Sequence, residues 1–188
     1  MVNLPNLLTI FRILLVPILV VVLLTKFPEK ELVGLGLFLL AALTDFLDGF
    51  LARRNKQVTR FGKLLDPAAD KMLTSAAFIS LVEMNPHATP AWMVVTIIGR
   101  EFAVGALRSF AASEQLVISA SALGKIKTVT QIVAIALLIF YNKLGEFRHL
   151  APISLWVAML MSLYSGIDYF VRFRKLVWKN GEAAEGRG

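Results

Sequence analysis

Long apolar segments dominate this sequence and limit what it can fold into. Six of them cover residues 7–25, 33–54, 65–84, 90–112, 119–141 and 150–172. A helix that crosses a bilayer core of about 30 Å needs roughly 17–25 apolar residues, which is close to the length of each segment. Backbone polar groups in lipid must be satisfied within the segment, so each is expected to be helical. We therefore predict an all-α integral membrane protein, a bundle of six transmembrane helices joined by short polar connections.

The overall composition supports a membrane protein rather than a soluble domain. Hydrophobic residues make up 57% of the 188 residues and charged residues only 18%, and the mean hydropathy is +0.69. The chain has no cysteine, which excludes disulfides and thiolate metal sites. We predict a single catalytic domain over residues 1–179. Residues 180–188 are small and polar and are expected to form a flexible tail.

The positive charge is unevenly distributed. Suppose that both termini and the second and fourth connections lie on one side of the membrane. That side then holds all of the 20 Lys and Arg residues except Lys26, Lys30, Lys143 and Arg148. By the positive-inside rule it faces the cytoplasm, which predicts a multi-pass protein of the cytoplasmic (inner) membrane with cytoplasmic termini and active site. The net charge of +7 does not indicate nucleic acid, because the basic residues lack interleaved aromatic residues. Anionic headgroups or phosphorylated substrates are the expected partners.

Four aspartates interrupt the second and third apolar segments. Asp45 and Asp48 are followed by Gly49 and Ala52 at positions i, i+3, i+4 and i+7, which share one helix face. Gly62, Asp66 and Asp70 follow the same design at i, i+4 and i+8. Acids at membrane depth are costly and are functional by default. We expect the two acidic faces to meet beside small residues that leave room for a ligand.

Four carboxylates around one volume cannot all stay ionised without cations. Two divalent ions, Mg²⁺ or Mn²⁺, would neutralise them and form a two-metal centre for phosphoryl displacement. Taken singly, the acids have simpler explanations. Asp66 precedes Pro67 and could be a helix N-cap, Asp45 or Asp48 could pair with a lysine, and Asp70 could be an ordinary interfacial charge.

The spacing Asp45-x2-Asp48-Gly49-x2-Ala52-Arg53-x8-Gly62-x3-Asp66-x3-Asp70 resembles the signature of the CDP-alcohol phosphotransferase family of integral membrane enzymes. The resemblance implies a six-helix fold, usually dimeric, that uses two divalent metals at a cytoplasmic site. The implied reaction is displacement of CMP from a CDP-linked lipid by an alcohol. A looser resemblance links the opening Pro-Asn-Leu-Leu-Thr-Ile-Phe-Arg and the segments 99–101 and 124–128 to members that transfer a phosphatidyl group from CDP-diacylglycerol to sn-glycerol 3-phosphate.

The family pattern implies roles for individual residues. The metal ligands are Asp45, Asp48, Asp66 and Asp70, and Asp70 is also the implied catalytic base. The CDP-lipid is expected at Gly49, Ala52, Gly62 and Arg53, with weaker expectations for Asn6 and Thr9.

Four cations near the cytoplasmic ends of the fourth and fifth segments are expected to bind the acceptor phosphate. They are Arg100, Arg108, Lys125 and Lys127. The alternatives are snorkelling to lipid headgroups or, for Arg100, pairing with Glu101 of a neighbour. Asp168 is expected to pair with Arg172 at i+4.

Two other functions stay open. The first is the same reaction with inositol phosphate, serine or phosphatidylglycerol as the acceptor. The second is divalent-cation transport, which the clustering of acids at one end beside cations disfavours.

Overall fold

The computed structural model describes the backbone of residues 4–55, 60–114 and 122–185, and the side chains of 7–44, 68–114 and 122–177. In this part of the chain the secondary structure is helical. The long helices are α1 (Leu4–Leu24), α2 (Lys30–Asn55), α3 (Arg60–Met84), α4 (Ala91–Ser113), α5 (Ala122–Ile139) and α6 (Leu150–Glu185). Two short 3₁₀ helices, η1 (Tyr141–Lys143) and η2 (Gly145–His149), join α5 to α6. The predicted all-α membrane bundle of six helices is confirmed.

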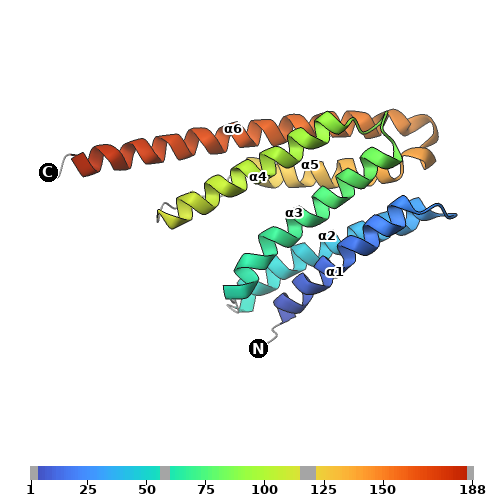
Figure 1. The fold of residues 1–188 in the computed structure, drawn as a ribbon, viewed down its shortest axis with the longest axis horizontal. Helices are drawn as coiled ribbons and strands as arrows, with labels where there is room; N and C mark the ends of the chain where they lie inside the picture. Colours follow the sequence, from blue (N-terminus) through green and yellow to red (C-terminus); the bar gives the residue numbers. More distant parts are fainter. Residues whose placement is uncertain (1–3, 56–59, 115–121, 186–188) are drawn as a thin grey trace.

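Successive helices run in opposite directions. The connections α1–α2, α3–α4 and α5–α6 lie at one end of the molecule, and both terminal helices start or finish at the other end (Figure 1). An ion pair between Glu29 and Lys143 links two connections of the first end. Glu29 has a positive φ of 62°, and its carbonyl accepts the amides of Leu32 and Val33 as α2 begins.

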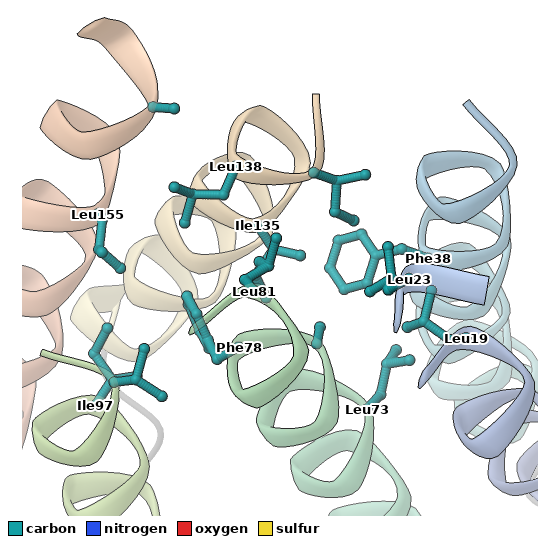
Figure 2. Close-up of a cluster of buried hydrophobic side chains, with 14 of the residues drawn as sticks. Leu19, Leu23, Phe38, Leu73, Phe78, Leu81, Ile97, Ile135, Leu138 and Leu155 are labelled. Atoms are coloured by element: carbon teal, nitrogen blue, oxygen red, sulfur yellow. The ribbon is translucent and has the colours of Figure 1, made fainter. Parts of the chain in front are cut away.

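Helix α3 lies in the middle of the bundle and contacts α1, α2, α4 and α5. Its residues Leu73, Phe78 and Leu81 are almost completely buried. Figure 2 shows them between Leu19, Leu23 and Phe38 on one side and Ile97 and Leu155 on the other. This apolar core fixes α3 against both halves of the bundle and therefore fixes the position of Asp70, one turn before Leu73.

The outer surface of the bundle is apolar, as a lipid-facing surface must be. Exposed side chains include Leu14, Val21, Ile79, Val95 and Ile167. Within the described residues, length and composition alone make three segments able to span a membrane: Leu7–Leu24, Ala122–Ile139 and Gly145–Val177. The charged residues of α4, such as Arg100, Glu101 and Arg108, lower the apolar character of that helix.

The end of α6 differs from the sequence-based expectation. Composition predicted a flexible tail from residue 180, but the helix continues to Glu185. Alanine and glutamate in this stretch are good helix formers, and an existing helix extends more easily than a new one starts.

Candidate active site

The two acidic segments lie at the same end of the bundle. Asp45 and Asp48 belong to the second half of α2, and Asp66 and Asp70 to the first half of α3. These antiparallel helices contact each other, so the segments lie on neighbouring helices. The predicted ligands Asp45, Asp48 and Asp66, and the predicted lipid-binding residues Asn6, Gly49, Ala52, Arg53 and Gly62, lie outside the described side chains. Among the side chains that are described, no group of three or more His, Cys, Asp or Glu forms a metal site.

The backbone of α3 excludes one alternative for Asp66. A helix N-cap would have to stand just before the first turn, but α3 begins at Arg60 and has no acid in its first turn. Asp66 and Pro67 therefore lie inside the helix. The interpretation of Asp66 as a simple cap is wrong.

Asp70 is the member of the acidic set whose side chain is described. It is partly buried, and its backbone carbonyl accepts a hydrogen bond from Thr74 Oγ at 3.1 Å. Its carboxylate interacts electrostatically with Lys127 of α5. Asp70 is therefore coupled electrostatically to Lys127, one of the predicted acceptor cations.

Arg100 and Lys127, two of the predicted acceptor residues, meet at a carboxylate that the sequence analysis left without a catalytic role. Glu101 Oε1 accepts hydrogen bonds from Lys127 Nζ at 2.5 Å, Arg100 Nη1 at 3.0 Å and Gln131 Nε2 at 3.3 Å. Arg100 Nη2 also donates to Ser165 Oγ at 2.8 Å. The network joins α4, α5 and α6. Glu101 thus pairs with the arginine of its own chain, whereas the sequence suggested a neighbour's.

Arg108 lies eight residues, about two turns, after Arg100 and also faces α6. Its guanidinium carbon is 5.4 Å from the ring centroid of Tyr169, a cation–π distance. Arg100 packs against Gly166, which lies on α6 like Tyr169. Lys125, the fourth predicted acceptor residue, is exposed near the start of α5. The structure therefore brings Arg100 and Lys127 together, with Arg108 farther along the same α4–α6 seam.

Thr9 and Arg12 are fully buried in α1. Arg12 Nε donates to the carbonyl oxygen of Ala41 on α2 at 3.3 Å, and Thr44 Oγ donates to the same oxygen at 2.7 Å. The sequence marked Arg12 as a cytoplasmic charge and as the end of the opening motif, but did not identify its partner. An arginine inside an apolar segment was the available signal that it has a specific buried partner.

Asp168 and Arg172 form the predicted i, i+4 pair on α6, with Arg172 Nε 3.0 Å from Asp168 Oδ1. This pair shares no residue with the contacts of Glu101. Asp168 can therefore serve as a control carboxylate when Glu101 is substituted.

A model of the CDP-alcohol phosphatidyltransferase family matches residues 2–164. The chain therefore belongs to this family of integral membrane enzymes. It is 44% identical, over 90% of its length and 94% of the relative's, to the CDP-diacylglycerol–glycerol-3-phosphate 3-phosphatidyltransferase of Bacillus subtilis. Proteins of the same name from Rickettsia bellii and Salmonella choleraesuis are 36% and 40% identical. These matches cover 92% and 89% of this chain and 96% and 92% of the relatives.

Proposed function

We propose that this chain transfers the phosphatidyl group of CDP-diacylglycerol to sn-glycerol 3-phosphate and releases CMP. The relatives that carry the name of this activity match the chain over about nine tenths of its length. The structural observation behind the proposal is the network in which Glu101 of α4 holds Arg100 and Lys127, together with the electrostatic interaction of Lys127 with Asp70 of α3. A base that interacts with phosphate-binding cations suits a hydroxyl nucleophile that carries its own phosphate.

The reaction is a displacement at phosphorus. The 1-hydroxyl of glycerol 3-phosphate attacks the phosphorus that bears the diacylglycerol, and the bond from that phosphorus to the CMP oxygen breaks. In this proposal Asp70 takes the hydroxyl proton as the new phosphorus–oxygen bond forms. The products are phosphatidylglycerophosphate and CMP.

The four aspartates are the proposed ligands of two divalent cations. Carboxylate oxygens are hard donors that suit Mg²⁺ and Mn²⁺, and the described backbone of α2 and α3 runs side by side. When bound, these cations offset the charge of the carboxylates and of the pyrophosphate. This compensation would offset the cost of placing four carboxylates at membrane depth.

The CDP-lipid is proposed to lie along α2 and the start of α3. Gly49, Ala52 and Gly62 have little or no side chain to obstruct cytidine and ribose, and Arg53 offers paired donors to the pyrophosphate. Asn6 of α1 is the remaining candidate for cytidine contact, whereas Thr9, the other candidate, is fully buried and would have to become accessible to take part.

The acceptor phosphate is proposed to bind Arg100, Arg108 and Lys127, with Lys125 at the exposed edge. Ammonium and guanidinium groups form strong, charge-assisted hydrogen bonds with phosphate. Lys127 interacts electrostatically with Asp70, so a phosphate bound at Lys127 is proposed to bring the acceptor hydroxyl toward the base.

The proposed setting is the cytoplasmic membrane, with both termini and the active site on the cytoplasmic side. The charge asymmetry of the sequence supports this orientation. Assembly as a homodimer is also proposed, on the basis of the family resemblance.

One assay tests the proposal. The purified protein is mixed with CDP-diacylglycerol, Mg²⁺ or Mn²⁺, and one alcohol from a panel of glycerol 3-phosphate, inositol phosphate, serine and phosphatidylglycerol. We expect rapid CMP release and phosphatidylglycerophosphate formation with glycerol 3-phosphate, and loss of both in EDTA. A higher rate with another alcohol, or metal-independent turnover, would contradict the proposal.

A further inference from the structure

Glu101 is the centre of the polar network in α4, α5 and α6. Its Oε1 atom accepts from its chain neighbour Arg100 and from two α5 residues, Lys127 and Gln131, which are one helical turn apart. The side chains of Arg100, Glu101 and Lys127 are only 10–15% exposed. One carboxylate therefore holds two shielded cations that come from different helices.

The contacts of Glu101 do not balance its cations by themselves, because Arg100 and Lys127 carry two positive charges and Glu101 one negative charge. Asp70 also interacts with Lys127 from α3, but in the proposed function its carboxylate serves the metal ions and the reaction, which leaves the cations for the acceptor phosphate. Lys127 has three ammonium hydrogens, and its bond to Glu101 uses one of them. A phosphate can bind the remaining donors while the bond to Glu101 is kept.

Without Glu101, Lys127 would lose the hydrogen bond that holds its flexible side chain against α4. Lysines near the ends of membrane helices normally extend toward the headgroups. The bond to Glu101 instead keeps Lys127 within the bundle, where it interacts with Asp70. Arg100 is fixed from a second direction by Ser165 of α6.

The geometry points to Glu101 as a positioning residue of the acceptor site, which aligns Lys127 and Arg100 for the phosphate of the acceptor alcohol. This inference rests on the proposed function and deepens it. Glu101 acts through the two cations and touches neither the reacting phosphorus nor the attacking hydroxyl. Gln131 supports it by directing Oε1 toward α5.

The test compares Glu101→Gln with Asp168→Asn. Both changes convert a carboxylate of the same bundle to its amide, but Asp168 pairs with Arg172 outside the network. In Glu101→Gln we expect the KM for glycerol 3-phosphate to rise about tenfold, equivalent to one charge-assisted contact. The KM for CDP-diacylglycerol should change less than about twofold, because the CDP-lipid does not use this contact. Asp168→Asn should leave both values unchanged.

A double-mutant cycle shows whether Glu101 acts through Lys127. The variant Glu101→Gln with Lys127→Gln should raise the KM for glycerol 3-phosphate by clearly less than the product of the two single effects, because coupled residues are not additive. Glu101→Asp keeps the charge and should recover part of the affinity for glycerol 3-phosphate. If Glu101→Gln does not fold, Gln131→Leu, which leaves the charges in place, should still raise that KM by about threefold through loss of the hydrogen bond that the Gln131 amide donates to the Glu101 carboxylate.

The outcomes separate the two proposals. If the unmodified protein releases no CMP with glycerol 3-phosphate, both the proposed function and this inference are wrong. If it is active but Glu101→Gln raises both KM values equally, or the cycle is additive, only the inference is wrong. A lower KM for glycerol 3-phosphate would also overturn the inference, because the carboxylate would then compete with the phosphate.

Discussion

Arg12 of α1 donates from Nε to the carbonyl oxygen of Ala41 on α2 at 3.3 Å, one turn before Asp45. Arg12 is completely buried although it lies in an apolar segment. The bond fixes α1 against the part of α2 that leads into the acidic segment. A buried cation thus links the packing of the first two helices to the candidate active site.

Replacing this arginine should destabilise the bundle. Arg12→Met removes a buried, charged hydrogen-bond donor, so we expect the free energy of unfolding to fall by about 2 kcal/mol. Thermal unfolding in detergent measures the change. Arg174→Met, at an exposed position of α6, is the control and should leave stability nearly unchanged. Equal melting temperatures for the two variants would mean that the buried contact contributes nothing.

Asp70→Asn should abolish turnover while much of the CDP-lipid binding remains. The amide keeps the shape of the side chain but cannot take the proton from the attacking hydroxyl. We expect a loss of about 10²–10⁴-fold in kcat, the usual contribution of a positioned base. CMP release gives kcat, and retention of labelled CDP-diacylglycerol gives binding. Glu83→Gln, an exposed change on the same helix, is the control. Normal turnover in Asp70→Asn would exclude Asp70 as the base.

Arg108→Ala should affect the acceptor more than the CDP-lipid. The change removes a cation that lies over the Tyr169 ring on the α4–α6 seam. We expect the KM for glycerol 3-phosphate to rise about tenfold, as for the loss of one charged phosphate contact. Lys143→Ala, at the opposite end of the bundle, should leave this KM unchanged. An equal rise in the KM of both substrates would contradict the role assigned to Arg108.

Gly166→Ala tests whether the position of Arg100 matters. A Cβ at residue 166 would lie 3.0 Å from Arg100 Cγ and 3.1 Å from Nε, so the arginine must shift. We expect the KM for glycerol 3-phosphate to rise about threefold, because small displacements weaken oriented charge contacts. Gly36→Ala is the matched control, since a Cβ there has no neighbour within 4 Å. Identical kinetics in both variants would show that Arg100 needs no fixed position.

The sequence predicted the helices and the Asp168–Arg172 pair within α6, but not the ion pairs that join different helices. Lipid leaves the backbone no alternative to helix, so the long apolar segments gave the helices to within a few residues at most ends. The period of the helix likewise placed Arg100 and Arg108 on one face, and both contact α6. The small, polar composition of residues 180–185 indicated a tail, although its alanine and glutamate residues also favour the helical extension that the structure has.

Local patterns by themselves determined the membrane helices, the shared helix faces of the aspartates and the candidate cations, because each depends on spacing within one segment. The short connection between the second and third segments was enough to make the two acidic helices neighbours. Only the tertiary structure decided which charges meet. Glu101 binds Lys127 across 26 residues of sequence and Arg12 binds Ala41 across 29. The rotation and depth of one helix against another set these contacts, and they depend on how the whole apolar core packs.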